Sequence, residues 1–170
     1  MSLLSYTQLV ELIEQGVIDA PIESVNAASI DLTFDKDILV RRMATGQAVW
    51  EEISLEDGCK YSLKPGEFML ASTREYLTMP LHVSAEYKLK SSMAREGINH
   101  LMAGWVDAGF HGKLTLEFVN HDLEAHEIWY GKKAGQLIFQ LHEPVPVEHS
   151  YLAKGRYNGQ QSVTASKGIK

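Results

Sequence analysis

The sequence predicts a mainly β fold, either a barrel or a sandwich. Three observations point to this class: many short segments alternate apolar and polar residues, turn-forming residues separate them, and only one early segment has helical spacing. A βαβ arrangement is disfavoured, because no helices of about 10–15 residues alternate with the strands.

Length and composition bound the function. The 170 residues, 45% of them hydrophobic, suit one globular domain with a substantial core. A net charge of −6 disfavours broad binding to nucleic acid or to an anionic membrane surface. The single cysteine, Cys59, excludes an internal disulfide and is typical of the reducing cytoplasm, where we expect the protein. We predict neither a signal peptide nor a membrane-spanning stretch.

The predicted elements follow the chain in order. Residues 5–16 predict a short amphipathic helix, since Ser5 and Gln8 fit a capping box and Gly16 can end the helix. Period-2 alternation, or a short apolar run beside a turn, marks the strands. They are residues 30–34, 68–71, 83–89, 128–130 and 136–141, with a further hairpin within 35–52.

Two segments stand outside this strand pattern. Ser91 or Ser92 can begin a single helical turn that ends at Gly97. From Lys154 the chain is polar and contains glycine, so we expect one domain over residues 1–153 and a flexible tail over residues 154–170.

The strand that contains Glu117 is the first candidate for chemistry. Leu116 and Phe118 share one face of this strand, and Thr115 and Glu117 share the other. A carboxylate in so apolar a strand is desolvated, paired or functional. The alternative is a solvated charge on an exposed face, which is the commoner case for a strand read alone.

Each neighbouring candidate also has a structural explanation. Ser91 and Ser92 fit helix caps as well as a site, and Arg95 fits an exposed surface. Asp107 before Ala-Gly fits a turn. Trp105 fits a pocket wall or, slightly better, a subunit interface. The seven histidines show no ligand spacing.

Two motifs in the middle of the chain resemble a known family. Lys-Ser-Ser-Met-Ala-Arg at residues 90–95 resembles the Arg-Ser-Ser-Leu-Ala/Gly-Arg motif of dCTP deaminases. Residues 103–117 resemble their Ala-Gly-Trp/Phe-Ile-Asp-Pro/Ala-Gly-Phe-x-Gly-x-Ile-Thr-Leu-Glu segment, most closely that of the bifunctional, dUMP-forming members. Residues 156–160 and 28–32 resemble the family's Lys-Tyr-x-x-Gln tail segment and its early Ala/Ser-x-Asp-Leu/Val strand.

The resemblance implies a fold and roles for individual residues. The fold is the distorted β-barrel of dUTPases, assembled as a homotrimer, with the tail closing over bound nucleotide. Glu117 would shuttle protons, Ser91 and the Ala103 carbonyl would position the water, Arg95 would neutralise charge near Glu117, and Asp107 would recognise the deoxyribose 3′-hydroxyl. The implied nucleotide-binding residues are Lys90, Ser91, Ser92, Met93, Ala94, Arg95, Asp107, Thr115, Leu116, Glu117, Arg156 and Gln160.

The cofactor expectation follows from the residue types. Many deaminases activate water with zinc held by His-x-Glu and Pro-Cys-x-x-Cys patterns, and this sequence has neither. A zinc-free route needs a carboxylate of raised proton affinity in a dry pocket, and Glu117 is placed for it. Mg²⁺ would be bound through the substrate phosphates.

The leading function is therefore deamination of dCTP to dUTP and ammonia, with further hydrolysis to dUMP left open. Met102 stands where deaminases usually carry a threonine that takes part in feedback inhibition by dTTP, so that inhibition is open too. One alternative is a dUTPase-type pyrophosphatase without deamination, although the glycine-rich dUTPase tail is absent. Another is a catalytically silent, nucleotide-binding regulatory trimer, against which the presence of both Glu117 and Arg95 argues.

Overall fold

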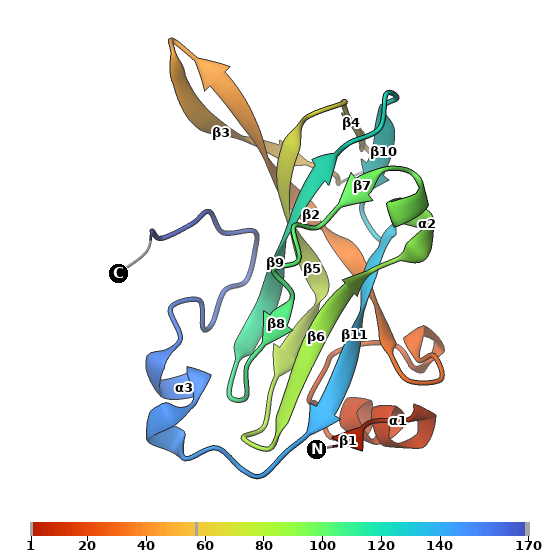
Figure 1. Ribbon diagram of the computed structural model, residues 1–170, viewed down its shortest axis with the longest axis vertical. Coiled ribbons are helices and arrows are strands. Elements are labelled where there is room, and N and C mark those ends of the chain that lie inside the picture. The colour runs from red at the N-terminus through yellow and green to blue at the C-terminus, as the bar shows by residue number, and fades with distance from the viewer. Residues whose placement is uncertain (1, 57, 169–170) are drawn as a thin grey trace.

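A curled antiparallel sheet forms the body of the protein (Figure 1), seen in a computed structural model that describes residues 2–56 and 58–168. The strands are β1 (Ser2–Leu3), β2 (Ile30–Ala44), β3 (Gln47–Ser54), β4 (Lys60–Leu63), β5 (Phe68–Thr78), β6 (Val83–Leu89), β7 (Ile98–Asn99), β8 (Trp105–Val106), β9 (His111–Asn120), β10 (His126–Trp129) and β11 (Lys133–Leu141). The helices are α1 (Tyr6–Glu14), α2 (Ser91–Arg95) and α3 (Tyr151–Lys154), with 3₁₀ turns η1 (Ile22–Ser24) and η2 (Val147–His149).

The main sheet has nine strands. Its central path runs β7-β9-β5-β2-β11-β6-β8, with β1 added to β11 and β3 added to β2. A separate two-stranded ribbon pairs β10 with β4. The predicted mainly β class is confirmed. Within the described part of the chain, the edge strands β7 and β8 do not pair with each other, so the sheet curls like half a barrel.

Strand alternation gives the sheet a core face, which carries Leu116, and an opposite face, which carries Thr115 and Glu117. Register between β5 and β9 places Glu117 opposite Leu70 and Thr115 opposite Ser72. The intervening Leu116 points into the core, where the neighbouring rings of Phe34 and Phe118 lie 5.2 Å apart. Because successive side chains of a strand alternate, burying Leu116 obliges Thr115 and Glu117 to face the other way.

The β2–β3 hairpin extends beyond the rest of the sheet (Figure 1). Thr45 and Gly46 at its tip both have positive φ, 49° and 81°, as expected for a tight two-residue turn. In the middle of β3, Trp50 contacts the Arg41 guanidinium at 4.7 Å and the Phe68 ring at 5.4 Å. The predicted hairpin is present, and it carries an aromatic side chain toward β5.

The helices are short, and α1 has the predicted position. The Ser5 N–H donates to Gln8 Oε1 over 3.2 Å, Leu9 and Leu12 are buried, and Gly16 follows the helix with a φ of 73°. Strands β1, β4, β7 and β8 and helix α3 were not predicted. No helix among residues 2–56 and 58–168 is long and apolar enough to cross a membrane.

The C-terminal segment lies along β9. Gln160 forms a parallel bridge with Gly112, and its carbonyl accepts the Lys113 N–H over 3.0 Å. Gly112 has a φ of 138°, and a Cβ atom there would lie 3.0 Å from the Gln160 carbonyl oxygen. A glycine at 112 therefore lets the tail approach the strand closely.

Candidate active site

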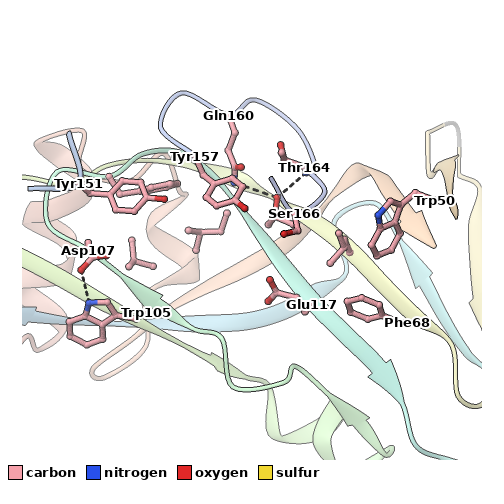
Figure 2. Close-up of a pocket in the computed structure, with 15 residues that line it drawn as sticks. Trp50, Phe68, Trp105, Asp107, Glu117, Tyr151, Tyr157, Gln160, Thr164 and Ser166 are labelled. Carbon is pink, nitrogen blue, oxygen red and sulfur yellow. Dashed lines mark hydrogen bonds between the residues drawn. The ribbon is translucent and has the colours of Figure 1, made fainter. Parts of the chain in front are cut away.

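A cavity of about 360 Å³ opens on the face of β9 that carries Glu117 (Figure 2). Strands β3, β5, β8 and β9, the start of α3 and the C-terminal tail all contribute to its wall. The lining residues are Trp50, Phe68, Leu70, Trp105, Val106, Asp107, Phe110, Leu114, Thr115, Glu117, Tyr151, Tyr157, Gln160, Thr164 and Ser166. No lysine or arginine is among them, so the wall is apolar except for two carboxylates, hydroxyls and an amide.

Glu117 lies between the two ends of this cavity. In Figure 2, Trp50 and Phe68 lie on one side of it, and Trp105 and Asp107 lie on the other. Burial raises the pKa of the Glu117 carboxyl, and a hydrogen bond from its own backbone opposes this only in part. Within the described residues, Glu117 forms no ion pair. A carboxylate of this kind binds a proton more readily than a solvated one.

Asp107 is held at the other end by the short strand β8. Val106 and Trp105 pair with Ala85 and Glu86 of β6. The Trp105 indole Nε1–H donates to Asp107 Oδ1 over 2.9 Å. The cavity therefore holds two carboxylates in different environments, one desolvated and one exposed to solvent and hydrogen-bonded.

The tail covers the cavity between these two ends. The Thr115 hydroxyl accepts the Thr164 backbone N–H over 3.1 Å and the Gln160 Nε2–H over 3.4 Å. Gln160 Nε2 also donates to the Lys113 carbonyl over 2.5 Å. The Gln160 Oε1 atom is buried without a partner among the described residues, and a ligand can supply one.

The structure therefore brings together four of the predicted site residues: Asp107, Thr115, Glu117 and Gln160. Arg156 lines a neighbouring cavity of about 450 Å³ and donates to the carbonyls of Lys167 and Gly168. Leu116 points into the core, and Ala103 lies in an exposed loop.

The predicted residues of segment 90–95 lie elsewhere. Lys90 pairs with the buried Asp31 at 2.5 Å, and Met93 is buried in the core. The other members are exposed on α2, on the opposite side of Figure 1 from the tail; they are Ser91, Ser92, Ala94 and Arg95. In one chain, therefore, α2 does not reach the Glu117 cavity.

Sequence reasoning missed most of the cavity wall. Trp50, Phe68, Tyr151 and Ser166 lie outside the recognised motifs, and Tyr157 lies within the motif of residues 156–160 but was not a candidate. The available signal was weak: Trp50 is a large aromatic residue that precedes two glutamates in the predicted hairpin. Among residues 2–56 and 58–168, no three His, Cys, Asp or Glu side chains gather in a metal-binding arrangement.

The arrangement suits a planar heterocycle carrying a polar group. Aromatic and aliphatic side chains form the walls, and Glu117 can give and take protons at a ring edge. Asp107 offers hydrogen-bond acceptors at the far end. Such a pair of differently placed carboxylates can contact two parts of one ligand.

Comparisons with known proteins place the chain in a family. Residues 3–142 match the family model described as dCTP deaminase-like. A Persephonella marina protein named dCTP deaminase, dUMP-forming, is 33% identical over 178 residues, covering 97% of this chain and 96% of the relative. A Corynebacterium glutamicum protein of the same name is 41% identical over 118 residues, covering 68% of this chain and 62% of the relative.

A solved structure supports the fold. The 2′-deoxycytidine 5′-triphosphate deaminase of Agrobacterium tumefaciens superposes with a TM-score of 0.68 at 21% identity. The match covers 82% of this chain and 48% of that longer chain. This chain therefore spans about half the length of the Agrobacterium tumefaciens protein. By the family model and by whole-length similarity to the Persephonella marina protein, the chain belongs to the dCTP deaminase-like family.

Proposed function

We propose that the protein hydrolyses dCTP to dUTP and ammonia, and then hydrolyses the dUTP to dUMP and pyrophosphate. The observation that carries this proposal is Glu117, a desolvated carboxylate of raised pKa without an ion-pair partner in a nucleoside-sized cavity. The names of the Persephonella marina and Corynebacterium glutamicum relatives support the same activity.

Deamination requires two rounds of proton transfer around C4 of cytosine. A water oxygen bonds to C4 while Glu117 accepts the water proton and passes it to ring nitrogen N3. Glu117 then takes the proton of the new C4 hydroxyl and delivers it to the amine, the C4–N4 bond breaks, the C4 carbonyl forms, and ammonia leaves. The raised pKa of Glu117 suits both halves of this cycle, because the carboxyl must hold the proton between them.

Phosphate hydrolysis uses the other end of the cavity. Asp107 accepts a hydrogen bond from the 3′-hydroxyl and, for the second reaction, takes the proton of a water that attacks the α-phosphorus. The bond from that phosphorus to the bridging oxygen breaks and releases pyrophosphate. The two carboxylates thus serve two reactions on one bound nucleotide.

We further propose that a second copy of the chain completes the site, within a homotrimer. The cavity wall contains no cation, although a triphosphate needs several. Exposed Ser91, Ser92 and Arg95 on α2 supply the missing types of group, and within the described residues Arg95 pairs with no carboxylate. An α2 helix from a neighbouring subunit would bring these groups to Glu117.

The cofactor proposal is Mg²⁺ bound through the substrate phosphates, without zinc. The donor set supports it, because the chain has one cysteine and the zinc-deaminase ligand patterns are absent. Magnesium commonly keeps several waters and binds through phosphates, where it would neutralise the leaving pyrophosphate. The single cysteine also fits the cytoplasmic location that we propose.

The decisive experiment supplies purified protein with dCTP or dUTP and assays ammonia and pyrophosphate separately. We expect dCTP to yield both products. Ammonia without pyrophosphate would leave a single-activity deaminase, and pyrophosphate from dUTP without ammonia from dCTP would favour the dUTPase-type alternative. Binding without either product would favour the silent regulatory trimer. Adding dTTP to the same assay tests whether Met102 is compatible with feedback inhibition.

A further inference from the structure

Trp105 is an exposed aromatic residue whose backbone is hydrogen-bonded to β6. It lies in β8, where it pairs with Glu86 of β6, and the preceding Gly104 carbonyl accepts the Tyr87 N–H over 2.7 Å. Yet 57% of the side chain is exposed. Single exposed apolar residues are common on protein surfaces, so what distinguishes Trp105 is the hydrogen bond that its indole makes.

The indole N–H of Trp105 is directed at the carboxylate of Asp107. Trp105 and Asp107 are two residues apart on extended backbone, so their side chains share one face. The Nε1–H donates to Asp107 Oδ1 over 2.9 Å, drawn as a dashed line in Figure 2. A tryptophan N–H can only donate, and an ionised carboxylate can only accept, so the roles in this bond are fixed.

The Trp105–Asp107 hydrogen bond restricts the rotation of the Asp107 carboxylate plane. The terminal torsion of an aspartate is broad and nearly free. A charge-assisted hydrogen bond to Oδ1 confines that torsion and leaves Oδ2 as the oxygen available to a ligand. Because both side chains line the same cavity, the orientation of Oδ2 there depends on the indole.

We propose that Trp105 is a positioning residue that fixes the plane of the Asp107 carboxylate, so that Oδ2 meets the deoxyribose 3′-hydroxyl and the water that attacks the α-phosphorus. This inference rests on the proposed function. Proton transfer from a water in line with a phosphorus needs a defined direction, whereas the bond to the sugar hydroxyl contributes to nucleotide binding and not to bond breaking at C4. Pyrophosphate release therefore depends on the indole N–H more than ammonia release does.

The first test is Trp105→Phe, which keeps an aromatic ring and removes the N–H. We expect kcat for pyrophosphate release from dUTP to fall roughly 10- to 100-fold, and kcat for ammonia release from dCTP to fall less than about 3-fold with a raised KM. Trp129→Phe is the matched control, since Trp129 is partly exposed against Lys60 and Lys132, outside the cavity. Equal losses in both reactions, or none, would overturn the proposal.

A thermodynamic cycle that combines removal of the substrate 3′-hydroxyl with Trp105→Phe tests the link between the indole and the sugar. Removing the 3′-hydroxyl, with 2′,3′-dideoxy-CTP as substrate, should lower kcat/KM for ammonia release by wild-type protein. The same removal should cost Trp105→Phe about 3- to 10-fold less, because its Asp107 is already poorly oriented. Strictly additive losses would mean that Trp105 and the 3′-hydroxyl act independently, and the positioning role would be wrong. This cycle works even if the protein proves to be a deaminase only.

A spectroscopic test needs no turnover. In protein labelled with ¹⁵N-tryptophan, the three indole N–H resonances of Trp50, Trp105 and Trp129 are assigned by single Phe substitutions. Asp107→Asn should shift the Trp105 indole resonance and leave that of Trp129 in place. An unmoved Trp105 resonance would refute the contact itself. Absence of both products from wild-type protein, with the shift present, would instead refute the proposed function and leave the contact standing.

Discussion

At the scale of single residues, Glu117 is the carboxylate of the cavity that burial separates most from solvent. We expect Glu117→Gln to abolish ammonia release from dCTP, because the amide keeps the shape but cannot accept the water proton. Nucleotide affinity should survive, as measured by calorimetry. Glu52→Gln on the exposed face of β3 is the control. Near wild-type ammonia release by Glu117→Gln would show that another group carries the proton.

The same substitution should change stability in a pH-dependent way. Burial raises the pKa of Glu117 above its ordinary value of 4.5, so ionised Glu117 destabilises the folded state and protonated Glu117 does not. Glu117→Gln should therefore stabilise the protein at neutral pH, by roughly 0.5–2 kcal/mol. The gain should shrink as pH falls toward the ordinary glutamate pKa. Urea unfolding at several pH values measures this, and a gain that grew at low pH would contradict the assigned burial.

Sequence reasoning located the two carboxylates of the cavity but not the walls around them. Glu117, Asp107, Thr115 and Gln160 lie in motifs whose spacing is specific. The aromatic residues Trp50 and Tyr151 reach the same cavity only through the tertiary arrangement of the β2–β3 hairpin and helix α3. Long-range packing of this kind leaves no local pattern.

At the scale of elements, the tail is the segment with the clearest expected function. We expect a chain truncated before Lys154 to fold normally, because residues 155–168 contribute no side chain to the main core. Its KM for dCTP should rise, or turnover should be lost, since the tail supplies Gln160 and covers the cavity. Circular dichroism checks folding and steady-state kinetics check function. Unchanged kinetics would show that the tail is a passive terminus.

Among the elements, prediction succeeded where alternation was long and failed where strands were short. Residues 83–89 alternate over seven positions, and β6 has these bounds. Strand β8 has two residues and is recognisable only through its pairing with β6. A single helical turn was predicted at the position of α2 and is present, but its N-cap is Lys90 and not Ser91 or Ser92.

At the scale of the whole molecule, assembly should be necessary for catalysis. If Arg95 and Glu117 of one site come from different subunits, co-expressed Arg95→Ala and Glu117→Gln chains should recover activity that neither has alone. Random mixing of equal amounts of the two chains would restore about one quarter of the sites, because a restored site needs Arg95 from one kind of chain and Glu117 from the other. The double variant mixed with either single variant should recover none. A fully active monomer by light scattering, or no recovery in the mixed trimers, would contradict a shared site.

The dependence of both reactions on Zn²⁺ and Mg²⁺ is a second prediction for the whole molecule and its substrate. We expect a zinc-selective chelator to leave both reactions unchanged, because the chain lacks the ligand patterns of zinc deaminases. Removing Mg²⁺ should slow turnover, most of all pyrophosphate release, where negative charge develops on the leaving group. Restoring Mg²⁺, but not Zn²⁺, should restore the rates. Inhibition by the zinc chelator in excess Mg²⁺ would count against the zinc-free mechanism.

Gly104 has a consequence for how such enzymes can diverge. A Cβ atom at this position would lie 2.6 Å from the carbonyl oxygen of Tyr87, a backbone atom of β6 that cannot swing aside. Any side chain at this position therefore requires main-chain displacement of β8 from β6. A lone substitution of Gly104 is closed to evolution, and change at this position needs accompanying changes that move the strand first.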